Sequence, residues 1–267
     1  MTPSRVVSLA CSNTEILHAL GCIHRLVGVD SHSDFPEDAL EGLPRLGPDL
    51  EIDPELVEAL EPDLVLASLT VPGHETVVEA MEARGLPVVV LAPQHLHEIP
   101  DNVRLVARLL DVEERGEALA LRLEEELVAP STRDPEPDDP SILVQWWPRP
   151  VIAPGRRSWV NGMIRAAGGR NVLAHEDRPS RPLEPEEVAH LAPEAIVVSW
   201  CGVHPDQYRP DVVRDNPAFR DVPAIRNDRV VCIPEALMGR PGPRLLQGLD
   251  ALRDVVGQLR DPRPAPT

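Results

Sequence analysis

Histidine has the clearest potential for chemistry in this sequence, and one of the nine is placed where ligands bind. His32 follows a predicted strand at residues 26–29, and α/β folds place ligand-binding residues at the carboxyl ends of their strands. An exposed loop histidine is the simpler interpretation of His32, and both interpretations stay open. His95 and His97 alternate in a predicted loop, a pattern that favours solvent-exposed side chains over a metal site.

The motifs that mark common enzyme classes are missing. The sequence contains no GxSxG, HExxH, GxGxxG or GxxxxGK motif. All 26 basic residues are Arg, so Walker-lysine, pyridoxal-phosphate and Schiff-base chemistry are excluded. The net charge of -18 argues against nucleic acid as a partner, because phosphate binding needs clustered cationic side chains. We therefore predict a binding protein with no catalytic residues.

Composition and cysteine usage are those of a globular protein. The sequence is 42% hydrophobic and 26% charged. No apolar run approaches the roughly 20 residues that span a bilayer, so membrane insertion is not expected. The four cysteines are scattered, which favours buried free thiols, and the sequence does not reveal their redox state: Cys11, Cys22, Cys201 and Cys232. The first residues lack the pattern of a secretory signal, so we expect either a cytoplasmic protein or a mature form that starts at an added Met.

The first hundred residues alternate short apolar strands with capped helices, the pattern of an α/β domain. Ser12 to Glu15 reads as a capping box, and Gly21 as the stop of the helix that follows it. Asp53 followed by Pro54 predicts the start of another helix. The remaining elements expected in this region are a strand at 5–9, a strand at 64–67, a helix at 75–84 and a strand at 88–91.

A long helical period separates this region from a second α/β region. Apolar residues recur at helical spacing from about 100 to 128, which predicts one long helix between two domains. Residues 130–140 are polar and rich in Pro, and predict a linker. We therefore expect an N-terminal lobe at 1–99, a connecting helix at 100–129 and a C-terminal lobe at 141–267. Elements expected in that lobe are strands at 142–146, 195–199 and 230–233, and helices at 159–167 and 244–259.

An internal repeat suggests that the two lobes share a topology. Residues 53–68 and 184–199 both contain an acidic cap, Pro, Glu, a short helix, Pro and an apolar strand that ends in Ser. Two such copies indicate two similar lobes facing one another across a cleft, although helix–Pro–strand connections also arise by chance. The repeat places Glu55 and Glu186 at equivalent helix starts. As a pair they could form a symmetric docking surface for a partner.

Aromatic residues are scarce, and all four Trp lie in the second lobe. Trp146 and Trp147 follow its first predicted strand, Trp159 begins a helix and Trp200 ends the strand of the repeat. Trp146 and Trp200, at strand carboxyl ends, suit the apolar wall of a site for a large flat ligand. At least one of the four is expected to be a core residue.

Several segments resemble the cobalamin-binding substrate-binding proteins of ABC transporters, a group that also serves iron siderophores and haem. The segments cover nearly the whole chain: 6–17 (VVSLACSNTEIL), 26–29 (LVGV), 34–36 (DFP), 60–67 (LEPDLVLA), 167–169 (AGG) and 240–244 (RPGPR). The resemblance implies two Rossmann-like α/β lobes joined by a single long rigid helix, with the ligand in a cleft between them. It further implies that Glu55 and Glu186 meet arginines of an ABC permease.

The resemblance also assigns ligand-contacting positions. By local matching these fall on His32, Asp49, Ser68, Trp146, Ser180 and Arg240, to which the strand-end position adds Trp200. Several family members have aromatic residues where this sequence has His32, Asp49, Ser68 and Ser180. His32 could instead be an axial ligand to cobalt, because a neutral imidazole suits such a metal.

We therefore expect a monomeric, non-enzymatic protein that binds cobalamin or a related corrinoid for delivery to an ABC importer. A ferric siderophore or haem is the alternative ligand. A cytoplasmic corrinoid carrier or a chelatase-like enzyme is the alternative class of protein.

Overall fold

The computed structural model describes residues 2–261, which divide into two compact units. Unit 1 comprises the chain up to Pro93 together with His97–Leu123, and unit 2 comprises Gln94–Leu96 and the chain from Glu124 onward. The division falls upstream of the Pro-rich segment that was predicted as the linker. Within the described residues, no helix is long and apolar enough to cross a membrane.

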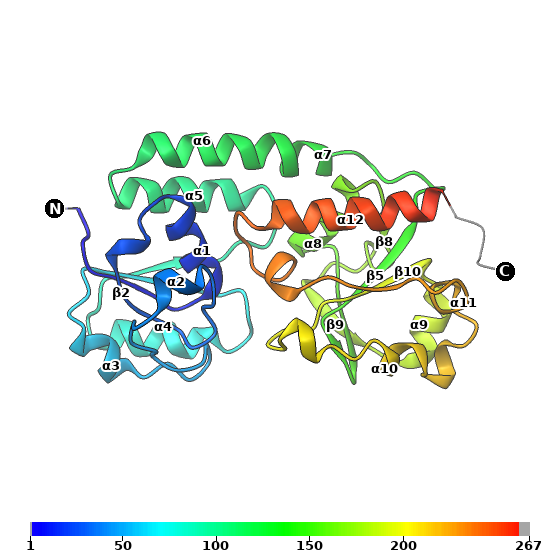
Figure 1. Ribbon diagram of the computed structural model, residues 1–267, viewed down its shortest axis with the longest axis horizontal. Coiled ribbons are helices and arrows are strands. Elements are labelled where there is room, and N and C mark those ends of the chain that lie inside the picture. The colour runs from blue at the N-terminus through cyan, green and yellow to red at the C-terminus, as the bar shows by residue number, and fades with distance from the viewer. Residues whose placement is uncertain (1, 262–267) are drawn as a thin grey trace. The chain divides into compact units, whose positions relative to one another are not determined.

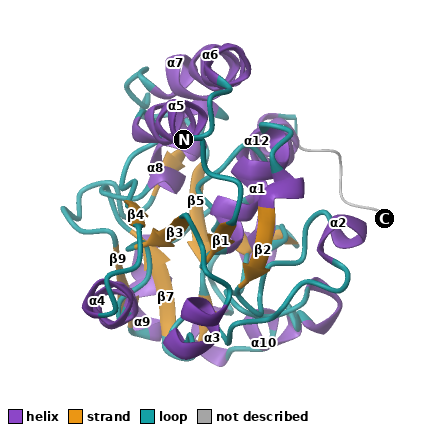
Figure 2. Cartoon of the chain, turned by 90° about the vertical axis from the view of Figure 1, so that its left-hand side faces the viewer, coloured by secondary structure: helices purple, strands orange, loops and turns teal. Residues whose placement is uncertain are grey.

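Unit 1 is built on a parallel four-stranded sheet in the order β2-β1-β3-β4. Its helices pack on both faces, with α1 and α5 on one side and α3 and α4 on the other (Figure 2). Covered on both faces, these strands are apolar runs rather than alternating ones, which is why they were recognisable in the sequence. The strands are β1 (Val6–Ser8), β2 (Leu26–Val29), β3 (Leu64–Ser68) and β4 (Val88–Leu91), and the helices are α1 (Cys11–Ala19), α2 (Glu37–Leu40), α3 (Pro54–Ala59) and α4 (His74–Ala83).

The start of α1 differs from the prediction, whereas its end and the start of α3 are confirmed. The N-cap of α1 is Ala10 and makes no side-chain bond, so the predicted capping box of Ser12 and Glu15 is wrong. Ser12 and Glu15 are instead the second and fifth residues of α1, and both are buried. Gly21 ends α1 with a φ of 69°, and the side chain of Asp53 accepts the backbone N–H groups of Glu55 and Leu56.

The predicted long helix is in fact two antiparallel helices, α5 (Glu98–Leu109) and α6 (Glu113–Leu123), which lie side by side (Figure 1). Asp111 turns the chain with a φ of 53°, and buried Leu110 and Val112 hold the turn against the unit. Hydrophobic periodicity missed this break because the helical period resumes after a turn of so few residues. The helical run that begins with α6 continues through a π-helical turn at Glu124–Val128 and α7 (Ala129–Ser131), so the unit boundary lies inside it.

Unit 2 repeats the topology of unit 1. Its parallel sheet has the order β11-β10-β5-β8, so in both sheets the second strand along the chain is an edge strand, followed by the first, third and fourth. The third strands, β3 and β10, are those of the internal repeat, so the repeat marks equivalent positions in two sheets. The strands are β5 (Ser141–Gln145), β8 (Arg170–Asn171), β10 (Ala195–Val198) and β11 (Val230–Cys232), and the main helices are α8 (Trp159–Ala166), α9 (Pro185–Leu191) and α12 (Leu245–Arg260).

A small antiparallel sheet in unit 2 was not predicted. It joins β6, β7 and β9 in the order β6-β7-β9, with Trp147 opposite Ile152 and Pro154 opposite Ser180. Its strands are short and contain several Pro, which normally argue against a strand. The bounds are β6 (Trp147–Pro148), β7 (Val151–Pro154) and β9 (Ser180–Leu183). The other short helices of unit 2 are α10 (Asp211–Arg214), α11 (Pro223–Arg226) and 3₁₀ turns at Pro205–Gln207, Pro217–Phe219 and Glu235–Leu237; unit 1 has one at Ile23–Arg25.

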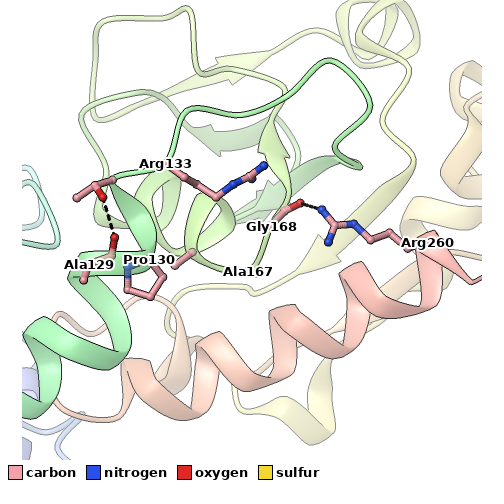
Figure 3. Close-up of a pocket in the computed structure, with 8 residues that line it drawn as sticks. Ala129, Pro130, Arg133, Ala167, Gly168 and Arg260 are labelled. Atoms are coloured by element: carbon pink, nitrogen blue, oxygen red, sulfur yellow. Dashed lines mark hydrogen bonds between the residues drawn. The ribbon is translucent and has the colours of Figure 1, made fainter.

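The Pro-rich segment 130–140 is tied to unit 2 at its end. The carboxylate of Asp139, only 5% exposed, lies 2.7 Å from Arg133 and accepts a 2.9 Å hydrogen bond from Arg260. Arg260 also donates to the carbonyl of Gly168 at the end of α8, beside a surface pocket lined by α7 and α8 (Figure 3). Asp139 and Arg260 together therefore join the segment, the last helix and the residues that follow α8.

Asp139→Asn is expected to destabilise the protein by about 1–3 kcal/mol, because it removes a buried charge that two arginines and a backbone N–H bind. Burial by itself would raise the pKa of Asp139, but the contacts with Arg133, the Glu136 N–H and Arg260 outweigh it and lower that pKa. The stabilisation is therefore complete above the ordinary value of 3.8 and is lost as the pH falls through the lower native value. Urea unfolding between pH 7 and pH 3 measures both effects, with the neighbouring exposed Asp138→Asn as the control; equal stability of the two variants would contradict this role.

Candidate ligand-binding site

Unit 1 gathers most of its predicted site residues at the carboxyl edge of its sheet. His32 lies in the loop after β2, and Ser68 is the last residue of β3. Asp49 lies in the loop that follows an isolated bridge between Val29 and Arg45, which brings this loop back to the end of β2. The structure thus brings together residues that are far apart in the sequence, at the edge where α/β proteins bind ligands.

A buried polar network fixes the loop that carries His32. Asp30 is fully buried; its carboxylate accepts the Ser33 hydroxyl at 2.5 Å and the backbone N–H of His32 at 2.9 Å. The Ser33 hydroxyl is 2.8 Å from that of Thr14, which donates to Ser8 at the end of β1. Burial raises the pKa of Asp30, against the opposing effect of these hydrogen bonds. The loop is therefore held rigidly at its backbone.

His32 and Asp49 form a cluster with a residue that the sequence did not single out, His74. One oxygen of Asp49 lies 3.7 Å from Nε2 of His32, and the other lies 3.4 Å from Nε2 of His74. The side chains of His32 and Asp49 are 49% and 34% exposed, whereas that of His74 is 5% exposed. The interaction with His74 lowers the pKa of Asp49, against the effect of burial. Asp49 is therefore ionised at neutral pH between two imidazoles.

Aliphatic side chains supply the apolar surface near this edge of unit 1. Leu50, Leu69 and Val71 are among the few large hydrophobic residues that are exposed, and they follow Asp49 and Ser68. The Ser68 hydroxyl itself is buried and lies 2.9 Å from the Thr70 hydroxyl. The aromatic residues of the sequence give no indication of this surface. Exposed Leu and Val at strand ends could not be distinguished from core residues in the sequence.

In unit 2 the tandem tryptophans lie at the corresponding carboxyl edge. Trp146 directly follows β5, is half-buried, and is fixed at its backbone by Ile152 and Cys201. Trp147 lies in β6 and is 41% exposed. The unpredicted antiparallel sheet positions this pair, and Trp147 presents the larger aromatic surface to solvent.

Trp200 belongs to the hydrophobic core of unit 2, so the expectation that it forms the wall of a site is wrong. It is 5% exposed, packs against Tyr208 and donates its indole N–H to the buried side chain of Gln145. Only a core position gives this indole both an apolar contact and a buried acceptor. Burial also raises the pKa of Tyr208 to about 12, so its hydroxyl stays protonated and donates to the Trp200 carbonyl.

Arg240 is held by a carboxylate and is mostly buried. Its Nε donates to Glu235 at 3.3 Å, and the backbone N–H of Glu235 donates to the Tyr208 hydroxyl at 3.0 Å. Trp200 and Tyr208 thereby support the loop that carries Arg240. Ser180, in contrast, is exposed on β9, where it lies opposite Pro154 of β7.

Glu55 and Glu186 occupy equivalent positions, each as the second residue of its helix and each exposed. Glu55 lies 3.3 Å from Arg84. Glu186 lines a shallow pocket with His175, Arg181, Glu187, His190 and Leu191. The structure confirms their equivalence, as the third strand of each sheet follows their helices.

The remaining reactive groups are the cysteines and the side chains that could bind a metal ion. All four cysteines are free, as expected, but Cys201 and Cys232 are exposed rather than buried. Among residues 2–261, no group of three or more His, Cys, Asp or Glu side chains is arranged to hold a metal ion.

The sequence of this chain matches the family model for periplasmic binding proteins over residues 6–237. The chain belongs to that family. Its members are binding proteins, so this chain is a non-enzymatic binding protein of two α/β units, as the missing motifs predicted.

Similar proteins match along nearly the whole length of the chain. A vitamin B12-binding protein of Vibrio parahaemolyticus is 28% identical over 250 residues, 92% of this chain and 86% of that protein. The apo structure of the haem-binding protein RhuT of Roseiflexus sp. RS-1 has a TM-score of 0.79 and 30% identity, and covers 97% of this chain and 98% of its own. The vitamin B12-binding protein BtuF of Vibrio cholerae has a TM-score of 0.78 at 24% identity and the same coverage, and shows the shared fold.

Proposed function

We propose that this protein binds cobalamin or a related corrinoid and delivers it to an ABC permease. The observation that carries the proposal is the nearly full-length similarity to a vitamin B12-binding protein. Exposed apolar side chains and a histidine at the carboxyl edges of the parallel sheets support it, because a corrinoid presents a broad apolar macrocycle and a metal centre.

The proposal gives each group of side chains a role. In unit 1, the exposed side chains of Leu50, Leu69 and Val71 offer apolar surface to a ligand. In unit 2, exposed Trp147 and half-buried Trp146 beside it offer aromatic surface. Exposed Ser180 and Arg240, which Glu235 already orients, meet the polar periphery of the ligand in unit 2. His32 approaches the metal. Glu55 and Glu186 bind arginines of the permease.

Haem is the second candidate ligand. The specific observation in its favour is the 30% identity to RhuT, a haem-binding protein. Haem shares the two features that the site residues would recognise, a flat apolar macrocycle and a metal with an open axial position. It carries two carboxylates that need cationic partners, and Arg240 is already paired with Glu235.

Titration of the full chain with aquocobalamin, cyanocobalamin and ferric haem, followed by calorimetry and visible spectra, tests the proposal. We expect both cobalamins to bind in the micromolar range or tighter, and haem to bind more weakly. Trp147→Ala should weaken cobalamin binding about tenfold or more, because it removes one exposed aromatic contact. Trp159→Phe is the matched control, since Trp159 donates its indole N–H to Met238 inside unit 2. Failure of both cobalamins to bind would refute the proposal, and haem binding in their place would establish the alternative.

A further inference from the structure

Asp49 is bracketed by two imidazoles of different character. Both of its oxygens are engaged, one toward exposed His32 and the other toward buried His74. Nε2 is the nitrogen that each ring turns toward Asp49, at 3.7 Å for His32 and 3.4 Å for His74. An ionised carboxylate only accepts hydrogen bonds, so it favours a proton on the Nε2 that faces it. In a neutral His32 ring, this arrangement leaves Nδ1 unprotonated, with its lone pair available to a metal.

His74 has no other polar contact that would explain a histidine in the interior. Within residues 2–261 neither ring nitrogen has a hydrogen-bond partner, and Nε2 lies 3.4 Å from a carboxylate oxygen of Asp49. A buried ring nitrogen without a partner costs free energy, and an apolar side chain could fill the same space without that cost. The contact with Asp49 is therefore the one feature of the described structure that accounts for His74.

A backbone hydrogen bond, a closely packed glycine and a side-chain contact fix the position of Asp49 between the two rings. The N–H of Ser31 donates to the carbonyl of Gly47 at 2.8 Å, which joins the Asp49 loop to the His32 loop. Gly47 has a φ of 113°, and a Cβ there would lie 2.3 Å from the carbonyl oxygen of Glu51, so only glycine allows this closed loop. On the other side, the side chain of Leu50 packs against Gly73, the N-cap of α4, which directly precedes His74.

We propose that Asp49 and His74 are positioning residues that hold the His32 imidazole with Nδ1 toward the metal of the bound chelate. The inference rests on the proposed function and deepens it, because it assigns the chelate's axial position to this one side chain. The ring nitrogen replaces the exchangeable water of an aquo chelate; one metal–oxygen bond breaks, one metal–nitrogen bond forms, and the oxidation state of the metal does not change. A ligand whose axial group cannot be displaced would bind without this contact.

The first test needs no ligand. Relaxation of the Cδ2–H group of His32, in protein labelled with ¹³C at histidine, reports how rigidly the ring is held. We expect an order parameter near that of rigid backbone, about 0.85, in the unaltered protein, and a fall toward about 0.6 in Asp49→Ala. Asp49→Asn keeps an acceptor oxygen and should lie between them. His74→Phe keeps the buried volume and should also loosen His32, with the melting temperature confirming that the variant is folded.

The second test compares aquocobalamin, whose axial water exchanges, with cyanocobalamin, whose axial cyanide does not exchange with imidazole. We expect a shift of the visible bands with aquocobalamin only, lost in His32→Ala. Asp49→Ala should weaken aquocobalamin binding about 10–100-fold, the usual effect of losing the partner of a metal-bound histidine, and should weaken cyanocobalamin binding by a smaller factor. His24→Ala is the matched control, because exposed His24 precedes the same strand, β2, that His32 follows.

The outcomes separate this inference from the proposed function. If both cobalamins bind but the spectrum does not shift, or if Asp49→Ala leaves the ring order and the affinity unchanged, the inference is overturned and the proposed function stands. If cobalamin does not bind but ferric haem does, with a Soret shift that depends on His32 and Asp49, the inference stands and the proposed ligand is wrong. Failure to bind either chelate would overturn both.

Discussion

Gly248→Ala is expected to destabilise unit 2 by about 3 kcal/mol or more, because a Cβ at this position would overlap a neighbouring backbone. Gly248 lies in α12, and the added carbon would stand 1.9 Å from the carbonyl oxygen of Leu237 and 3.0 Å from the side chain of Met163. A carbonyl that belongs to a 3₁₀ turn cannot rotate away as the tip of a flexible side chain can. The helix must therefore move away from the turn.

The disturbance should extend to the site, because the same turn contains Glu235, which holds Arg240. We expect the ligand affinity of Gly248→Ala to fall as well as its melting temperature, by about 6–12 °C for 3 kcal/mol in a protein of this size. Thermal unfolding and ligand titration measure the two effects.

Gly257→Ala in the same helix is the matched control. Nothing lies within 4 Å of the Cβ that it would add, so it should stabilise the helix by about 0.5–1 kcal/mol. Equal stability of the two alanine variants would contradict the close packing of α12 on the turn.

The strands and most helix positions were predictable because the fold puts buried apolar runs between strong stop signals. Gly21 and the Asp53 cap mark the ends of helices in both sequence and structure. The internal repeat also predicted a feature of the tertiary structure, the equivalence of β3 and β10. The shared strand order of the two sheets confirms it. Local signals of this kind need no knowledge of the tertiary structure.

Features set by tertiary contacts were not predictable. The helical period on either side of Asp111 is intact, so only the packing of α6 against α5 shows that the chain reverses there. Trp146, Trp147 and Trp200 all follow or adjoin strand ends, and the sequence could not show that Gln145 would bury the indole of Trp200. The residue type alone therefore could not show which of the three tryptophans lies in the core.

The site itself was predicted in part. His32 and Asp49 were found by strand-end position and by family resemblance, but neither signal links them to each other or to His74. That link depends on the bridge from Val29 to Arg45 and on the loop closed at Gly47. Contacts between loops from different strands have no periodicity, so a single sequence carries no pattern for them.

Reversing the charges of Glu55 and Glu186 together should abolish productive docking while leaving ligand binding intact. Both glutamates are exposed, and neither is among the residues proposed to contact the ligand. If each binds an arginine of the permease, a contact of about 1.5 kcal/mol is lost on each side, and affinity for the permease falls on the order of a hundredfold. The effect of the single Glu186→Arg change should exceed that of Glu55→Arg, because Glu55 already shares Arg84 with Glu58.

Binding of the purified protein to its permease in nanodiscs, measured at low and at physiological ionic strength, tests this expectation, since exposed ion pairs weaken as salt is added. The control is a double variant with the same change in net charge at exposed positions elsewhere, Glu82→Arg with Asp254→Arg, one in each unit. A general electrostatic attraction would weaken equally in both double variants. Specific docking predicts that only the Glu55 and Glu186 variant loses affinity for the permease. An equal loss of affinity in the control would refute the assignment of these two glutamates, whatever ligand the protein carries.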